Sequence, residues 1–152
     1  MSNPPLKSHT ILVVDDNEDD YEAIVRAFKK VGLNNPVALC KTGKEAIGFL
    51  KHGGSFNEIG IAERPALILL DLNMPGMDGH KVLQQIKEDA SLRRIPVIIW
   101  TTSSNDKDID ACYQTGANAY MQKPATTEGL LESVKRLKEY WLEAVLLPGD
   151  NL

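Results

Sequence analysis

The chain has 152 residues, a formal net charge of −4, 43% hydrophobic and 25% charged residues. A globular chain of this length can bury roughly two thirds of the surface it exposes when unfolded, and the composition is unlike that of disordered proteins. The negative charge and the lack of a Lys/Arg cluster disfavour a nucleic-acid partner, because such binding depends on neutralised phosphates. No apolar run reaches the ~20 residues of a membrane span, and the chain does not begin with a signal peptide, so we expect a cytoplasmic protein.

Five short apolar runs along the chain are typical of β-strands: residues 10–16, 36–40, 65–72, 95–102 and 118–123. A stretch with apolar side chains at helical spacing follows each of them: residues 20–32, 42–54, 79–89, 105–116 and 126–145. The first, third and fourth strands are apolar almost throughout, as in parallel strands covered on both faces. Five such units are too few for a closed barrel, which needs eight. We therefore predict an α/β fold with an open, doubly wound parallel sheet and helices on both faces.

The cysteines and histidines have no spacing that predicts a metal site. Cys40 and Cys112 are far apart and lack a CxxC pattern. We expect both to be small buried side chains rather than disulfide partners. His9, His52 and His80 are expected to be surface residues.

Polar side chains end four of the predicted strands: Asp15 and Asp16, Asp71, Thr101 and Lys123. The carboxyl ends of parallel strands meet at one edge of a sheet, so we expect these side chains to lie together. Two carboxylates about 4 to 5 Å apart repel by roughly 3 to 4 kcal/mol at an effective dielectric constant near 20, which calls for a cation. Oxygen ligands without histidine or cysteine suit Mg²⁺.

Asp71 ends the apolar strand in the stretch LILLDLNMPGMDG. An aspartate can attack phosphorus and form an acyl phosphate, with a metal ion, a lysine and a hydroxyl stabilising the charge on the phosphoryl oxygens. The turn at Pro75 and Gly76 shapes a loop from which the backbone carbonyl of Asn73 can reach the metal. Asp71 is therefore our candidate phosphoacceptor.

Over about residues 9–140 the sequence resembles the receiver domains of two-component response regulators. The shared features are an acidic pair after the first strand, an aspartate ending the third, a Thr or Ser ending the fourth and a Lys-Pro after the fifth. The resemblance implies a flavodoxin-like sheet in the order 2-1-3-4-5 and a signalling protein rather than an enzyme. It also implies phosphorylation of Asp71 by a histidine kinase, with Thr101 and Lys123 assisting. Mg²⁺ would be held by Asp15, Asp16, Asp71 and the carbonyl of Asn73.

The resemblance also implies a switch made of Thr101 and Tyr120. In receivers the hydroxyl turns toward the new phosphoryl group and the aromatic side chain rotates inward, which changes the surface of the fourth helix, fifth strand and fifth helix. Two positions depart from the usual pattern: Thr102 stands where a small residue is common, and Ala125 where Phe is frequent.

Three segments lie outside this core. We expect residues 1–8 to be a flexible N-terminus and residues 52–65 a surface loop. Residues 141–152 form an apolar extension with candidate dimerisation residues Trp141, Leu142, Val145 and Leu146. Both the loop and the extension are similar to those of the small stand-alone regulators paired with cyanobacterial-type phytochrome kinases. We therefore expect a homodimer and a phytochrome-type kinase partner.

Several alternatives stay open from sequence. Asp15 and Asp16 could serve only as caps of the first helix, a role that Asn17, Glu18 or Asp19 could also fill. Asp71 could serve only to cap its turn. A receiver that docks without phosphorylation is one alternative function. A phosphatase of the haloacid-dehalogenase type is another, although it needs an acid where Asn73 stands. An FMN-binding flavodoxin is a third, although the acids after the first strand would repel a phosphate.

Overall fold

The computed structural model describes residues 10–51, 64–74 and 76–148. The predicted flexible N-terminus, His9, His52, nearly all of the predicted surface loop and Pro75 lie outside the described residues.

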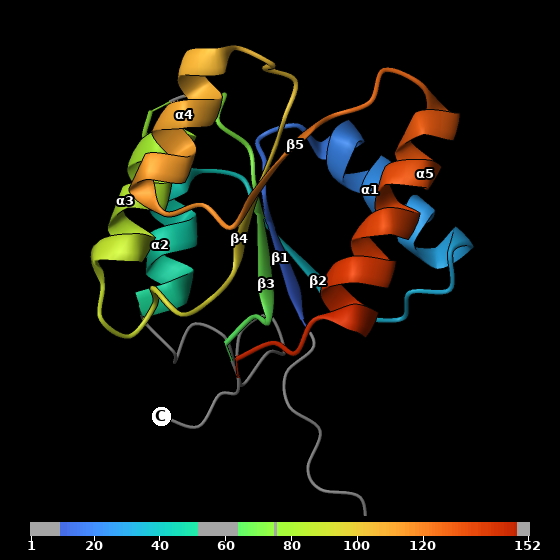
Figure 1. The fold of residues 1–152 in the computed structure, drawn as a ribbon, viewed down its shortest axis with the longest axis horizontal. Coiled ribbons are helices and arrows are strands. Elements are labelled where there is room, and N and C mark those ends of the chain that lie inside the picture. Colours follow the sequence, from blue (N-terminus) through green and yellow to red (C-terminus); the bar gives the residue numbers. More distant parts are fainter. Residues whose placement is uncertain (1–9, 52–63, 75, 149–152) are drawn as a thin grey trace, which may run out of the picture.

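Five parallel strands form one sheet in the order β2-β1-β3-β4-β5, which confirms the predicted fold class and strand order. The strands are β1 (Ile11–Val14), β2 (Val37–Cys40), β3 (Leu67–Leu70), β4 (Val97–Thr101) and β5 (Ala119–Gln122). The helices are α1 (Glu18–Lys30), α2 (Gly43–Lys51), α3 (Gly79–Glu88), α4 (Asp106–Thr115) and α5 (Thr127–Leu137). Helices α1 and α5 cover one face of the sheet, and α2, α3 and α4 cover the other (Figure 1).

Alternate strand residues supply the two halves of the core, because successive side chains of a strand point to opposite faces. Leu12, Ile68 and Ile99 pack with α2, α3 and α4. Ile11 and Leu69 pack with α1 and α5 on the other face. Both faces are thus buried, which explains why β1, β3 and β4 are apolar without interruption.

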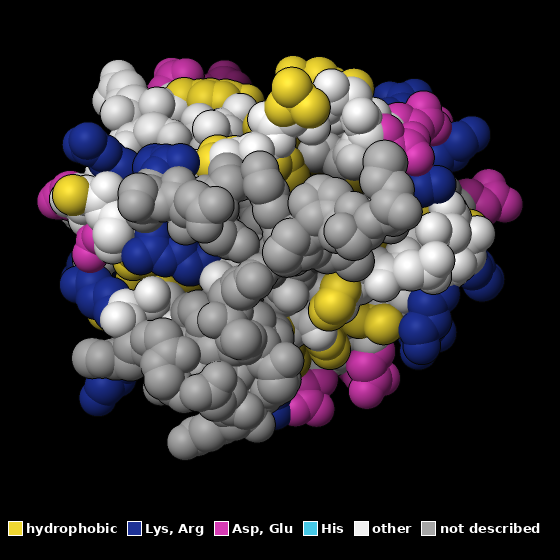
Figure 2. All heavy atoms as spheres, turned by 90° about the horizontal axis from the view of Figure 1, so that it is seen from below, with side chains coloured by type: hydrophobic (Ala, Val, Ile, Leu, Met, Phe, Trp, Pro, Cys, Tyr) yellow, Lys and Arg dark blue, Asp and Glu magenta, His cyan; other side chains and the backbone are white. Residues whose placement is uncertain are grey.

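The carboxyl ends of the strands lie at the upper edge of the sheet in Figure 1, where the connections into α4 and α5 also run. The opposite end of the molecule carries both basic and acidic side chains around its rim (Figure 2).

Gly79 lets α3 begin directly against the end of β3. A Cβ atom at this position would lie 2.2 Å from the carbonyl oxygen of Asp71 and 2.6 Å from the Cα atom of Leu72. Backbone atoms cannot yield as a flexible side chain can. The absence of a side chain at Gly79 therefore fixes the path of the chain around Asp71.

The last helix differs from the single long helix that we predicted. Helix α5 ends at Leu137, and residues Lys138–Ala144 continue as a π-helix, η2. The backbone N–H of Val145 donates to the carbonyl oxygen of Tyr140 at 2.8 Å, five residues earlier. The wider turn brings the adjacent side chains of Trp141 and Leu142 against the core beside α1 and α5.

The cysteine prediction is confirmed, since Cys40 and Cys112 are both buried and both free thiols. Within the described ranges, no helix has the length and apolar character that a membrane crossing requires.

Candidate functional site

Three carboxylates meet at the carboxyl edge of the sheet. Asp15 and Asp16 follow β1 and Asp71 follows β3, and one oxygen from each lies within 4.8 Å of the others. Asp15 and Asp71 are buried, with 2% and 5% of their surface exposed, whereas Asp16 is exposed. The predicted acidic cluster is therefore formed, and we refer to these three residues as the acid cluster.

The ammonium of Lys123, just after β5, lies against the acid cluster. Its Nζ atom is 2.7 Å from Oδ2 of Asp15 and 3.2 Å from Oδ2 of Asp71. The Lys123 side chain is only 10% exposed. Two buried carboxylates thus share one buried ammonium, which compensates part of their mutual repulsion.

The second oxygen of each buried carboxylate is held by its own loop. Oδ1 of Asp15 accepts from the backbone N–H of Asn17 at 2.9 Å, and Oδ1 of Asp71 accepts from that of Asn73 at 3.2 Å. Each loop therefore orients one carboxylate so that its remaining oxygen faces Lys123. Asp71 does stabilise its turn, as the structural alternative proposed, but only one of its two oxygens is used for this.

Asn17 is the residue that caps α1. Its side-chain oxygen accepts from the backbone N–H of Asp20 at 3.1 Å. This observation argues against the alternative that Asp15 and Asp16 serve only as helix caps.

Asp20 is a third partner of Lys123 that we did not predict. Its Oδ2 atom lies 3.0 Å from Nζ, and its side chain is 43% exposed. Its place in the first turn of α1 gave no signal of this contact, because the partner lies 103 positions away along the chain. Three carboxylates, those of Asp15, Asp20 and Asp71, therefore contact the ammonium of Lys123.

Burial and neighbouring charges shift the pKa values of Asp15 and Lys123. Burial raises the pKa of Asp15 above its ordinary value of 3.8, although the hydrogen bonds from Lys123 and Asn17 act to lower it. Burial would lower the pKa of Lys123, but its hydrogen bonds with Asp15 and Asp20 and the nearby charges outweigh burial and raise it. Both pKa values are raised, and the two shifts are consistent. The ammonium of Lys123 is stabilised by several carboxylates, whereas Asp15 shares that single ammonium with other acids.

Thr101 ends β4 beside the acid cluster and is fully buried. Its hydroxyl oxygen accepts from the side-chain amide of Asn73 at 3.4 Å. The same asparagine is thus linked to Asp71 through its backbone and to β4 through its side chain. Thr102, the next residue, is exposed.

The hydroxyl of Tyr120 donates to the backbone carbonyl of Ser103, 3.0 Å away in the connection between β4 and α4. The ring is partly buried against the core beside α3 and α4. Ser103 in turn donates to Asp108 at 2.7 Å. Both residues of the predicted switch are therefore connected to the segment between β4 and α4. Thr101 lies where this segment begins, and Tyr120 donates a hydrogen bond to it.

His80 is not the surface residue we predicted. It is half-buried between α3 and α4, and its Nε2 atom lies 3.1 Å from Oδ1 of Asp108. Its Nδ1 atom lies 3.8 Å from the thiol of Cys112. No sequence pattern indicated this link, because it depends on how the two helices pack.

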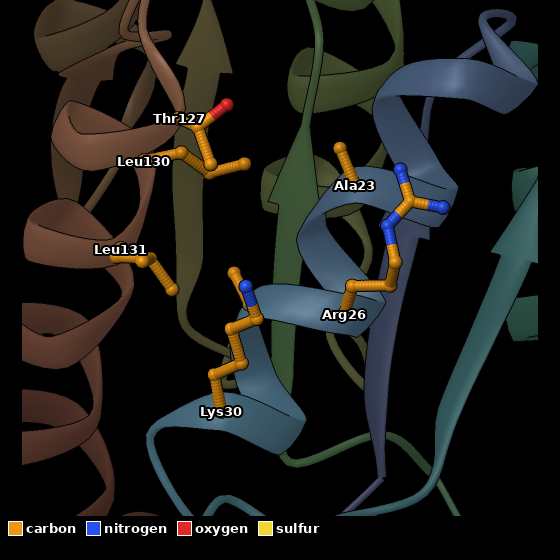
Figure 3. A pocket seen from close by; sticks show the side chains of 7 residues that line it. Ala23, Arg26, Lys30, Thr127, Leu130 and Leu131 are labelled. Carbon is orange, nitrogen blue, oxygen red and sulfur yellow. The ribbon is translucent and has the colours of Figure 1, made fainter.

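The acid cluster fits a hard divalent cation. All its donors are carboxylate oxygens, the ligands that Mg²⁺ prefers, and its three acids exceed the charge of the one buried ammonium beside it. A shallow groove between α1 and α5 offers no such site, since its lining includes Arg26 and Lys30 and no acid (Figure 3).

The predicted dimerisation residues divide into two groups. Trp141 and Leu142 pack in part against the core of their own chain. Val145 is half-buried, whereas Leu146 is 96% exposed. The extension therefore hides part of the apolar surface that we expected to be free.

Asp15→Asn tests whether the cluster is strained without a cation. A carboxyl group whose folded-state pKa is raised stabilises the fold fully below its unfolded pKa, and this stability is lost as the pH rises through the folded value. In EDTA, we expect the free energy of unfolding of Asp15→Asn to increase relative to that of the wild type as the pH rises above about 4, because the wild-type carboxyl resists ionisation in the folded state.

Urea unfolding followed by circular dichroism measures this difference. Millimolar Mg²⁺ should stabilise the wild type more than the variant, because the variant lacks one acid of the cluster. A difference that falls with pH would mean that the bond to Lys123 outweighs the burial of Asp15.

Comparison with known proteins agrees with this geometry. The family model of the response regulator receiver domain matches residues 11–135. The probable methanogenesis regulatory protein FilR2 of Methanothrix harundinacea is 40% identical over 139 residues, covering 91% of this chain and 87% of that protein. The response regulator Rcp1 of Synechocystis is 37% identical over 148 residues and 97% of each chain.

Solved structures show the same fold. The phosphorylated cyanobacterial phytochrome response regulator RcpA has a TM-score of 0.84 and 38% identity, over 93% of this chain and 99% of that chain. The Mn²⁺-bound form of Rcp1 has a TM-score of 0.83 and 35% identity, over 93% of this chain and 99% of that chain. The chain belongs to the response regulator receiver domain family.

Proposed function

We propose that Asp71 accepts a phosphoryl group from a histidine kinase in a Mg²⁺-dependent reaction. The observation that carries this proposal is the meeting of Asp15, Asp16 and Asp71 with the ammonium of Lys123 at one edge of the sheet. A carboxylate that only capped a turn would not need a buried lysine and two further acids around it.

The step transfers a phosphoryl group without oxidation or reduction. A carboxylate oxygen of Asp71 forms a bond to phosphorus while the bond from phosphorus to the imidazole nitrogen of the donor histidine breaks. The product is an acyl phosphate, and the histidine leaves as a neutral imidazole after it takes up a proton. Lys123 and the hydroxyl of Thr101 are the groups of this chain that would contact the phosphoryl oxygens.

Mg²⁺ would be held by Asp15, Asp16, Asp71 and the backbone carbonyl of Asn73. Bound there, it would neutralise charge on the phosphoryl oxygens. The Mn²⁺-bound structure of Rcp1 supports a divalent cation in a relative of this fold. The oxygen-only donor set favours Mg²⁺ as the ion in this chain.

Phosphorylation would act on α4, β5 and α5 through Thr101 and Tyr120. A phosphoryl group that draws the Thr101 hydroxyl would move the start of the β4–α4 segment, where Ser103 accepts the hydrogen bond of Tyr120. Loss of that bond would free the ring to change its position. The surface around α4 would then report the state of Asp71.

A phytochrome-type kinase is the partner that the relatives favour. RcpA is described as a phytochrome response regulator, and it is covered by this chain over 99% of its length. FilR2 is described as a methanogenesis regulatory protein, so the family resemblance alone does not select the kinase. The expected cytoplasmic location stays a prediction.

The C-terminal extension would form a homodimer through its exposed apolar side chains. Leu146 is almost fully exposed, and Tyr140 in η2 is 59% exposed. Large apolar side chains exposed on one segment are typical of association surfaces. Trp141, Leu142 and Val145 would contribute mainly by supporting that surface from within.

Acetyl phosphate tests the phosphoacceptor directly. With millimolar Mg²⁺ we expect one added phosphoryl group in the intact mass of the wild type and none in Asp71→Asn, because the variant lacks the attacking carboxylate. The exposed Asp110→Asn on α4 is the matched control and should be modified like the wild type. An unmodified wild type would favour the receiver that only docks.

Leu146→Glu tests the dimer. A charge in an apolar contact should raise the dissociation constant about tenfold or more, as seen by light scattering over a dilution series. Tyr113→Ser removes an exposed aromatic side chain from α4 and serves as control. A wild type that stays monomeric at every concentration, or a Leu146→Glu protein that dimerises normally, contradicts the proposal.

A further inference from the structure

Asp20 binds the same ammonium as Asp15 and Asp71 but is not part of the acid cluster. Its side chain is 43% exposed, compared with 2% for Asp15 and 7% for Asp71. Among the residues that the structure describes, the acids placed to share a metal ion are those of the acid cluster alone. Asp20 is therefore the partner of Lys123 that a bound cation would leave free.

The three N–H donors of Lys123 are matched by three carboxylates in this structure. A divalent cation in the acid cluster would compete for oxygens of Asp15 and Asp71 and would repel the ammonium. Lys123 would then lose at least part of its buried bonding. A buried ammonium without partners is costly, so its new position needs an acid that the cation does not use.

We propose that Asp20 is a positioning residue for Lys123 and holds the ammonium at the edge of the pocket while a divalent cation occupies the acid cluster. This inference rests on the proposed function, because the metal site concerned is that of the phosphoacceptor Asp71. The ammonium is thereby withdrawn from Asp71 but kept beside it.

The first turn of α1 fixes the backbone position of Asp20 beside the pocket. Its backbone N–H donates to the side chain of the cap residue Asn17 at 3.1 Å. Its carboxylate lies at the margin of the pocket, where a partly exposed ion pair exchanges partners at low cost. A fully buried acid would hold Lys123 too firmly to serve both states.

Calorimetric titration of the unphosphorylated full chain with MgCl₂ tests the proposal. We expect Asp20→Asn to weaken Mg²⁺ binding by about three- to fivefold, the range of one partly exposed ion pair, and Asp20→Glu to restore most of it. Asp19→Asn is the matched control, since Asp19 is an acid of the same turn outside the contacts of Lys123. It should bind Mg²⁺ nearly as the wild type does.

A comparison of double variants shows whether Asp20 acts through Lys123 or only through its negative charge near the metal site. In a Lys123→Met background, Asp20→Asn should weaken binding no more than Asp19→Asn does. The proposal is overturned if Asp20→Asn and Asp19→Asn have equal effects in the wild type, if the effect of Asp20→Asn persists without Lys123, or if the wild type takes up no Mg²⁺. The titration involves no phosphoryl transfer, so its result is independent of whether acetyl phosphate modifies Asp71.

Discussion

The ion pairs of Lys123 with Asp15 and Asp71 are the interaction on which this edge of the molecule depends. They join the segment after β5 to the ends of β1 and β3, which are separated from it by 108 and 52 positions along the chain. Without the ammonium, two buried carboxylates would face each other in a poorly hydrated pocket, at a cost of several kcal/mol by ordinary estimates for buried charge. The charges that hold the site together are thus the ones that the proposed phosphoryl transfer would use.

These charges are not fully balanced by the protein itself. The pKa of Asp15 is raised by burial even with Lys123 beside it, and Asp16 brings a third, exposed carboxylate within 4.8 Å of the other two. A pocket of this kind favours any ligand that brings positive charge in a small volume. The proposed affinity for a divalent cation therefore follows from the same close placement of acids that Lys123 only partly compensates.

The sequence predicted the fold and the acid cluster because both follow from local patterns. Unbroken apolar strands indicate a covered parallel sheet, and residues that end such strands must share an edge. Asp20 and His80 were missed for a different reason, because their partners come from other parts of the chain. Asp20 at the start of α1 meets Lys123 after β5, and His80 of α3 meets Asp108 of α4. The π-helical turn at Lys138–Ala144 was also missed, since it depends on how Trp141 and Leu142 meet the core.

The central claim is that the acid cluster holds a divalent cation directly beside Asp71. Crystals soaked in MnCl₂ test it most directly, because anomalous scattering locates manganese without reference to the protein atoms. The account predicts one strong anomalous peak bounded by the carboxylates of Asp15, Asp16 and Asp71 and the carbonyl of Asn73, with Lys123 displaced toward Asp20. A peak elsewhere, or full soaking with no peak at the end of β3, would contradict it.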